Sequence, residues 1–275
     1  MPKGIKQSML IAHLSDLHVL AKGKLAYGRV DTAPMVERAI AHVKNLSPDV
    51  VVITGDLVHN VEPAEYAKLK QLLSSLTIPL YLLPGNHDSR ALIRESFTDH
   101  DYLPAEDFLQ YTVEDYPLRL IMLDTNVPGE GRGELCCDRL QWLCDQLSQQ
   151  PDKPTLLFMH HPPFTTGIAL MDGFGLTGHE ALTDIVRRYS CIQRIGCGHI
   201  HRPIQTLWAG TLAYTVPSPV HQVSLDLNAQ ASTFVMEPPA YQLHLWDSNR
   251  GLVSHTQYIN NYDGPYHFFP DNSHR

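Results

Sequence analysis

Six short apolar runs, rich in aliphatic and β-branched residues, alternate along this chain with stretches that carry apolar residues at helical spacing. Apolar runs of this length without polar alternation are typical of strands buried on both faces of a sheet. Regular alternation of strands and helices therefore predicts a layered α/β fold. The expected strands cover 9–14, 49–55, 80–84, 118–124, 155–160 and 192–198, and the expected helices cover 33–46, 63–76, 137–149 and 180–189.

Five of these six runs end in side chains that can bind a metal ion. They are Asp16 and His18 after the first run, Asp56 after the second, Asn86, His87 and Asp88 after the third, His160 and His161 after the fifth, and His199 and His201 after the sixth. Sites in open α/β folds form outside the carboxyl ends of the strands, so we expect these residues to share one edge. Side chains at i and i+2 of extended backbone point the same way. Asp16 is therefore expected to converge with His18, and His199 with His201.

The donor atoms in this set indicate the kind of metal. Carboxylate oxygen combined with imidazole nitrogen suits Mn, Fe, Co, Ni or Zn better than calcium. The donors suffice for two metal ions, and the solitary Asp56 is expected to bridge them. Glycines precede Asp56, Asn86 and His199, where they permit tight turns and a close approach of backbone.

The ordered motifs "DLH" (16–18), "GD" (55–56), "GNHD" (85–88), "HH" (160–161) and "GHIH" (198–201) resemble those of the calcineurin-like metallophosphoesterase superfamily. The wider sequence is similar to its bacterial branch of cyclic-AMP phosphodiesterases and glycerophosphodiesterases. The resemblance implies an α/β fold, a four-layer α/β/β/α sandwich with a small C-terminal β-rich cap. We expect a core over 8–205, and a region over 206–275 that completes the second sheet and forms a cap or oligomerisation surface.

The resemblance also implies roles for particular residues. One divalent ion (Fe, Mn, Zn or Co) would be held by Asp16, His18, Asp56 and His201, and a second by Asp56, Asn86, His160 and His199. As catalytic residues, His87 would contact the substrate phosphate or leaving group and Asp88 would orient His87. His221 is a further candidate to line the substrate site, whereas His161 is expected to point away from it. Tyr27 and Arg29 follow the first motif, and a plain loop is the simpler interpretation of them.

The function that follows is hydrolysis of a small phosphodiester, either a cyclic nucleotide such as cyclic AMP or a glycerophosphodiester, by a hydroxide that bridges the two metals. A phosphomonoesterase with the same site is the closest alternative. A non-catalytic metal-binding scaffold is the alternative from another functional class. Such a scaffold would be expected to have lost ligand residues, and no ligand position of the motifs is missing here.

Composition restricts the partners and the compartment. A net charge of −8 argues against binding to a nucleic-acid polymer, which needs a cationic surface. The apolar runs are only strand-length, so we expect no membrane span, and the N-terminal stretch does not resemble a signal peptide. The five cysteines lack zinc-type spacing, which favours free thiols in the cytoplasm. The exposed aromatic residues expected in "YDGPYHFF" (262–269) predict a homodimer or higher homo-oligomer.

Overall fold

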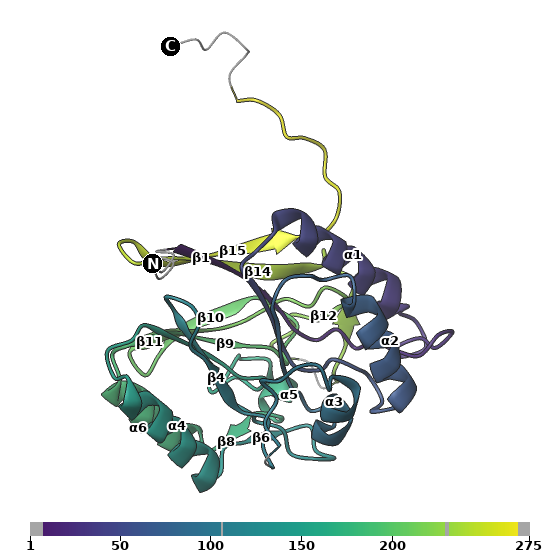
Figure 1. Ribbon diagram of the computed structural model, residues 1–275. Helices are drawn as coiled ribbons and strands as arrows, with labels where there is room; N and C mark the ends of the chain where they lie inside the picture. Colours follow the sequence, from purple (N-terminus) through teal and green to yellow (C-terminus); the bar gives the residue numbers. More distant parts are fainter. Residues whose placement is uncertain (1–7, 106, 229–230, 269–275) are drawn as a thin grey trace, which may run out of the picture.

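The computed structural model describes residues 8–105, 107–228 and 231–268, and two stacked sheets form its centre (Figure 1). The first sheet has the order β15-β14-β1-β2-β3. Its strands β1 to β3 run parallel, and β14 pairs antiparallel with both β1 and β15. The strands are β1 (Ser8–Leu14), β2 (Val50–Thr54), β3 (Leu80–Leu83), β14 (Ala240–Asp247) and β15 (Gly251–Tyr258).

The second sheet has the order β10-β11-β9-β7-β5-β4. Its four inner strands run parallel, and the two edge strands β10 and β4 are antiparallel to their neighbours. The strands are β4 (Tyr111–Val113), β5 (Arg119–Met122), β7 (Thr155–Phe158), β9 (Ile192–Cys197), β10 (Ile204–Trp208) and β11 (Thr211–Thr215). The six strands expected from the apolar runs are all present.

Helices cover the outer face of each sheet, which makes the predicted four layers (Figure 1). On the first sheet lie α1 (Thr32–Leu46), α2 (Pro63–Leu73) and α3 (Arg90–Ser96), and on the second lie α4 (Cys137–Gln149) and α6 (His179–Arg188). The alternation of strand side chains explains the layering. In β2, Val51 and Ile53 pack toward α1 and α2, whereas Val50 and Val52 pack between the sheets against residues such as Phe158.

Short elements complete the edge at which the parallel strands end. They are α5 (Ala169–Asp172) and two small sheets, β6 (Gly133–Glu134) with β8 (Leu176–Thr177), and β12 (Gln222–Val223) with β13 (Phe234–Val235). The region after residue 205 is expected to complete the second sheet. In the structure it serves both sheets, because β11 joins the second sheet and β14 and β15 extend the first.

The described part of the C-terminal tail leaves the body of the molecule (Figure 1). Tyr266 is 78% exposed and Phe268 is 100% exposed. The rest of the expected aromatic segment, from residue 269 onward, lies outside the described residues. Within the described ranges, none of the helices combines the length and the apolar character that crossing a membrane requires.

Candidate metal centre

The residues predicted to share one edge do lie together there. Each follows the carboxyl end of a parallel strand: β1, β2, β3, β7 or β9. Ligand atoms of Asp16, His18, Asp56 and His201 all lie within 4.8 Å of one another, and all four residues are buried. This is the first of the two ligand sets implied by the sequence motifs.

Close contacts among imidazole nitrogens and carboxylate oxygens define this first cluster. His18 Nε2 lies 3.1 Å from His201 Nε2 and 3.5 Å from Asp56 Oδ2. His201 Nε2 lies 3.5 Å from Asp16 Oδ1. The four side chains therefore direct their donor atoms at one small volume.

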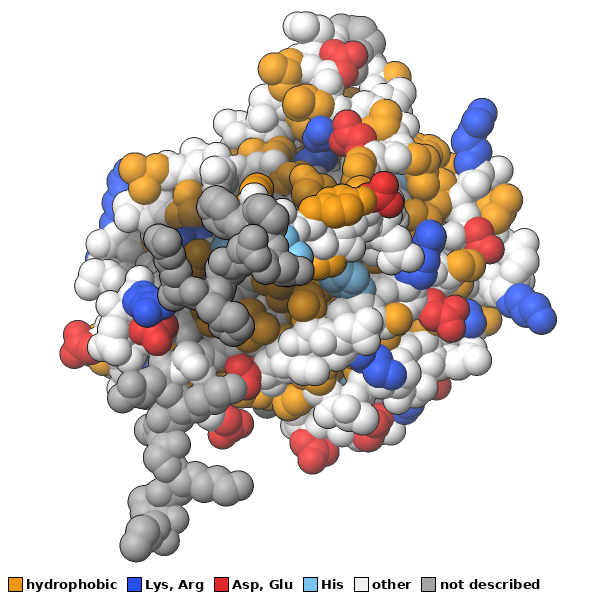
Figure 2. Space-filling view, turned by 90° about the horizontal axis from the view of Figure 1, so that it is seen from above, with side chains coloured by type: hydrophobic (Ala, Val, Ile, Leu, Met, Phe, Trp, Pro, Cys, Tyr) orange, Lys and Arg blue, Asp and Glu red, His pale blue; other side chains and the backbone are white. Residues whose placement is uncertain are grey.

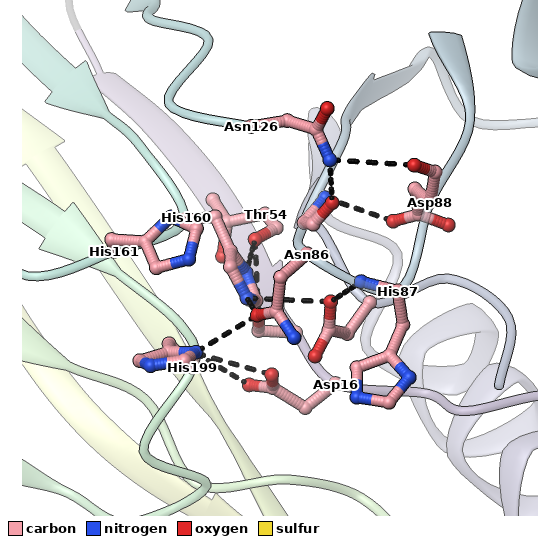
Figure 3. Close-up of polar contacts among 12 residues, drawn as sticks. Asp16, Thr54, Asn86, His87, Asp88, Asn126, His160, His161 and His199 are labelled. Atoms are coloured by element: carbon pink, nitrogen blue, oxygen red, sulfur yellow. Dashed lines mark hydrogen bonds and ion pairs between the residues drawn. The ribbon is translucent and has the colours of Figure 1, made fainter. Parts of the chain in front are cut away.

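A second cluster is centred on the amide oxygen of Asn86, which lies between His160 and His199 (Figure 3). Asn86 Oδ1 is 3.1 Å from His160 Nε2 and 3.0 Å from His199 Nδ1. His160 Nε2 is also 3.4 Å from Asp56 Oδ1. Asp56 thus presents one carboxylate oxygen to His18 in the first cluster and the other to His160 in the second, which is the geometry of a bridging ligand.

In His160 and His201, a hydrogen bond from Nδ1 to a backbone carbonyl leaves Nε2 as the nitrogen that faces the clusters. His160 Nδ1 donates to the Thr54 carbonyl at 2.7 Å, and His201 Nδ1 donates to the His221 carbonyl at 3.0 Å. When each imidazole is neutral it has one N–H, so Nε2 of each ring then presents its lone pair to the site, as a metal ligand must.

The buried charges have shifted pKa values. Burial lowers the pKa of His18 well below its usual value, and burial together with His160 lowers that of His199 to about 3, so both rings stay neutral. Burial would raise the pKa of Asp56, but the imidazoles of His160 and His87 hold it well below its usual value. Burial likewise lowers the pKa of His160, yet Asp56 outweighs it and raises that pKa to about 9, so a metal ion binding here displaces a proton.

These residues fit a pair of divalent ions. The donors are two carboxylates, one amide oxygen and four imidazoles, a mixture that suits first-row transition metals and zinc. His199 Nε2 is buried without a hydrogen-bond partner in the described structure. Two buried carboxylates this close together are costly unless positive charge compensates them, which a pair of cations would supply.

Asp16 and His18 do converge, as do His199 and His201, but the explanation from i and i+2 spacing on extended backbone is wrong. The φ angles are 59° at Asp16 and 43° at His18, 49° at Asp56, and 70° at His199 and 54° at His201. These are left-handed conformations, not the extended backbone that the i and i+2 argument assumes. Non-glycine residues in this region are strained, typically by about 1–3 kcal/mol each, and such strain concentrates at functional sites.

Two glycines allow the loops to meet, as predicted. A Cβ on Gly85 would collide with a carboxylate oxygen of Asp56, and a Cβ on Gly55 would lie 2.5 Å from the backbone nitrogen of Gly85. The loops after β2 and β3 therefore pack backbone to backbone beneath the clusters.

The structure contradicts the role expected for Asp88. Its carboxylate accepts hydrogen bonds from the backbone N–H groups of Gly85 and Leu57 and from the Tyr66 hydroxyl. His87 is held instead by the His59 carbonyl, 2.7 Å from its Nδ1, and by its own N–H, which donates to Asp56 Oδ1. Asp88 therefore fixes the loop that carries Asn86 and His87, because its oxygens are used by that loop and its neighbours.

His161 lies beside the second cluster but is held by its own partners. Its Nδ1 is 2.8 Å from the Thr125 hydroxyl and its Nε2 is 3.2 Å from the Gly131 carbonyl. Burial, with His199, lowers its pKa well below the usual value. The expectation that His161 points away from the site is wrong, because ligand atoms of His160, His161 and His199 all lie within 4.8 Å of one another. With both nitrogens engaged, His161 supports the wall of the site.

Two contributors were not recognised from the sequence. His59 has no motif, yet its Nδ1 is 3.3 Å from His18 Nδ1 and its ring stacks on His87 with centroids 5.5 Å apart. Asn126, after β5, donates to the Gly85 carbonyl at 2.5 Å. A signal existed for Asn126, because "DTN" (124–126) ends the fourth apolar run in polar residues as the other runs do. No comparable signal marks His59.

A cleft of about 470 Å³ opens over both clusters. His87 and His221 line it together with an apolar wall that includes Tyr27, Phe174 and Phe234. The His221 ring lies 4.6 Å from that of His201, and its Nδ1 is buried without a hydrogen-bond partner in the described structure. Arg29 lines a neighbouring pocket instead.

Comparison with known proteins gives consistent results. The family model described as "Calcineurin-like phosphoesterase" matches residues 9–203. The chain is 42% identical to "Probable glycerophosphodiester phosphodiesterase GpdQ" of Arcobacter nitrofigilis, over 95% of this chain and 97% of that protein. It is 34% identical to a "Probable cyclic nucleotide phosphodiesterase" of Rhodopseudomonas palustris, over 92% and 93%. The crystal structure of a dimetal phosphatase from Danio rerio shares the fold with a TM-score of 0.64 at 15% identity, covering 92% of this chain and 99% of that one.

Proposed function

Because the chain belongs to the calcineurin-like phosphoesterase family, we propose that it hydrolyses small phosphodiesters at the two clusters joined by Asp56. The observation that carries the proposal is the division of the Asp56 carboxylate between them. The names of the relatives indicate two substrate classes, glycerophosphodiesters and cyclic nucleotides. Both classes are diesters small enough for the cleft.

Two divalent ions are the cofactors that this site would hold, one at Asp16, His18, Asp56 and His201, the other at Asp56, Asn86, His160 and His199. When bound, such ions supply positive charge against the phosphoryl oxygens and acidify water. Fe, Mn, Zn and Co all match the donor set, and their availability decides which are taken up.

His87 is proposed as the catalytic residue that touches the substrate. Its Nδ1 is committed to the His59 carbonyl, so Nε2 is the atom left to face the cleft. Burial opposes protonation, but Asp56 and the His59 carbonyl raise the pKa of His87, which favours a ring with a proton on Nε2. That proton can be donated to a phosphoryl oxygen or to the departing alkoxide.

His221 is proposed as a substrate-binding residue on the opposite wall. Burial, with His201, lowers its pKa to about 3, so the ring is neutral and its unpartnered nitrogen is available for one hydrogen bond. Asn86 sits at the floor of the same cleft between the two sides.

The charges around the cleft favour a diester over a monoester. No lysine or arginine is among the described residues that line it. The two arginines closest in sequence to the motifs are committed elsewhere, Arg90 to Asp124 and Arg202 to Glu237. A monoester dianion is commonly bound by free arginines, so their absence from the lining favours a substrate with a single negative charge.

The test is a comparison of kcat/KM for bis(p-nitrophenyl) phosphate, p-nitrophenyl phosphate, cyclic AMP and glycerophosphocholine under one metal condition, with a chelator as control. We expect the diesters to exceed the monoester by about tenfold or more, which corresponds to about 1.4 kcal/mol of transition-state stabilisation. A tenfold advantage of the monoester would favour phosphomonoesterase activity. Tight metal binding without any turnover would favour a binding scaffold.

Other properties of the proposed enzyme follow from its surface and thiols. The face in Figure 2 carries lysine and arginine side chains scattered among acidic ones, without a continuous basic band, which disfavours a nucleic-acid polymer. All five cysteines are free, which is consistent with the cytoplasm. The exposed aromatic residues of the tail support a homodimer or larger homo-oligomer.

A further inference from the structure

The layer between the two sheets is apolar at one end and polar at the other. At the apolar end, residues such as Met9, Val52 and Phe158 pack together. At the other end, β14 and β15 face β10 and β11 across the layer (Figure 1), and a pocket of about 450 Å³ opens between them. Side chains that include Arg194, Gln205, Gln242, Ser254 and Thr256 line this pocket. An open, polar end departs from the apolar packing of the rest of the inter-sheet layer, and such departures are expected at functional sites.

Arg194 is the charged side chain of this pocket. Its guanidinium donates from Nη1 to the Ser254 hydroxyl and from Nη2 to the Leu252 carbonyl at 2.5 Å. Within the described ranges, no carboxylate forms an ion pair with it, and no aspartate or glutamate lines the pocket. An arginine has about five N–H donors, so several remain for a ligand. The cation is partly desolvated here, since burial lowers the pKa of Arg194.

The neighbours of Arg194 supply further hydrogen-bonding groups from other directions. Thr256 and Gln242 lie on adjacent strands and bond to each other at 2.9 Å, and Gln205 approaches from the second sheet. Hydroxyl, amide and guanidinium donors arranged around a small volume match the several acceptor oxygens of a phosphate group. The volume falls within the range of about 300–1,000 Å³ that is common for small-molecule sites.

We propose that this Arg194 pocket is a second binding site, distinct from the metal centre, for a small anion that carries a phosphate group. The proposal does not depend on the reaction catalysed at the clusters. It assigns a ligand to the one charged side chain of the pocket, and it explains why this end of the layer is hollow and lined by hydrogen-bonding groups.

A buried chain of hydrogen bonds joins this pocket to the metal centre. Ser254, which accepts from Arg194, lies 2.7 Å from His244 Nδ1, and His244 Nε2 lies 2.9 Å from the Tyr214 hydroxyl. That hydroxyl lies 3.2 Å from His13 Nδ1, and His13 Nε2 lies 2.9 Å from the Thr54 hydroxyl.

Thr54 completes the connection, because its carbonyl accepts the Nδ1 proton of His160 in the second cluster. An anion that draws Arg194 away from Ser254 changes the first link of this chain. We therefore expect occupancy of the pocket to alter turnover at the metal centre.

Binding is tested first, by equilibrium dialysis of metal-loaded protein with radiolabelled inorganic phosphate. The wild-type chain is expected to bind one more phosphate per chain than Arg194→Met, or to bind it about tenfold or more tightly. Arg250→Met, an exposed arginine in the β14–β15 turn, is the matched control and should bind as the wild type does. Arg194→Lys keeps the charge without the fork of donors and should bind weakly while preserving the fold, which is checked by circular dichroism.

Equal phosphate uptake by wild-type and Arg194→Met protein would overturn the site. Equal competition by acetate would overturn its assignment to phosphate-bearing anions. A change in molecular mass of Arg194→Met, with no change in phosphate uptake, would show that Arg194 meets a carboxylate of a second copy instead.

The connection is tested separately, through the pattern of phosphate inhibition. With a diester substrate, wild-type inhibition is expected to contain a non-competitive component that Arg194→Met and Tyr214→Phe both lack. Tyr214→Phe keeps the ring that lines the pocket and removes only the hydroxyl, which bonds to His13 and His244, so it should still bind the second phosphate. Unchanged inhibition in Tyr214→Phe would overturn the connection and leave the binding result to stand by itself.

Discussion

At the scale of single residues, the proposed metal centre depends on one carboxylate more than on any other side chain. Asp56 lies 3.5 Å from His18 and 3.4 Å from His160, with a different oxygen toward each. The other proposed ligands serve one cluster each. The loss of Asp56 should therefore affect both clusters, whereas the loss of any other ligand should affect chiefly one.

Asp56→Asn is expected to remove both metal ions, because one carboxylate oxygen of the bridge becomes an amide nitrogen that cannot bind a cation. Elemental analysis of purified protein should find two metals per chain in the wild type and fewer than one in the variant. Asp184→Asn, exposed on α6, should keep both. Two metals with full turnover in Asp56→Asn would refute the bridge.

His87→Ala is expected to keep the metals but to lower kcat by about a hundredfold or more, the usual scale for a lost proton donor or charge-stabilising group. Its ring lines the cleft, whereas its backbone N–H makes the bond to Asp56 and survives the substitution. Paired metal analysis and steady-state kinetics check this, with His255→Ala, exposed on β15, as control. A variant that loses one metal would identify His87 as a ligand.

The sequence predicted that these residues converge, because each follows an apolar run and such runs end at one edge of a sheet. It did not predict how they converge. The left-handed φ angles of residues such as Asp16 and His199 are imposed by the packing of several loops, which no local pattern encodes. His59 was missed for the same reason, since only the folded loops bring it to His18 and His87.

At the scale of elements, the long strands and helices could be predicted and the short ones could not. β2 is buried at every position, so its sequence is uniformly apolar. By contrast, β4 has three residues and α3 has seven, which is too little for a periodic pattern to stand out. The polar end of the inter-sheet layer also escaped prediction, because His13 and His244 look like ordinary histidines until their strands pair.

The buried histidine network should make stability depend on pH. Burial, with Arg194, lowers the pKa of His244 from its usual 6.5 to about 3, and its other neighbours are the uncharged His13 and the hydroxyls of Ser254 and Tyr214. Below about pH 6.5 the unfolded chain binds a proton at His244 that the folded chain does not. The free energy of unfolding is therefore highest above that pH and decreases as the pH falls. From pH 7.5 to pH 5, His244 should account for about 2 kcal/mol of that loss.

Urea unfolding at both pH values checks this. His244→Gln should lose about 2 kcal/mol less than the wild type over the same interval, whereas His255→Gln, exposed on β15, should behave like the wild type. Parallel pH profiles for all three proteins would show that His244 titrates normally in the folded chain.

At the scale of the whole molecule, strand–helix alternation predicted a layered α/β fold, and the four-layer arrangement was implied by the resemblance of the motifs to those of metallophosphoesterases. The contribution of the C-terminal region to both sheets did not follow, because an antiparallel pair such as β14 and β15 can join either sheet edge. β14 pairs with β1, which is far from it in the sequence. This pairing depends on which sheet edge is free once the parallel strands have assembled.

The tail permits a test of assembly. A chain that ends at Asn260 lacks exposed aromatic residues such as Tyr266 and Phe268, so it is expected to form a smaller species than the full chain. Light scattering at micromolar concentration should show the full chain as a dimer or larger. The melting temperature should stay within a few degrees, because the aromatic residues removed are largely exposed and Tyr262 meets the body at one ring contact, with Tyr258. A monomeric full-length chain would contradict the prediction.

The left-handed φ angles of the proposed ligand residues lower the stability of the fold, although the same residues are needed for the reaction. A population of variants selected only for resistance to heat would gain by replacing strained residues such as His18 or Asp56 with glycine, which adopts these angles freely. Each gain would remove a metal ligand. We therefore expect thermal selection without an activity screen to erode this centre first, while the four layers around it become more stable.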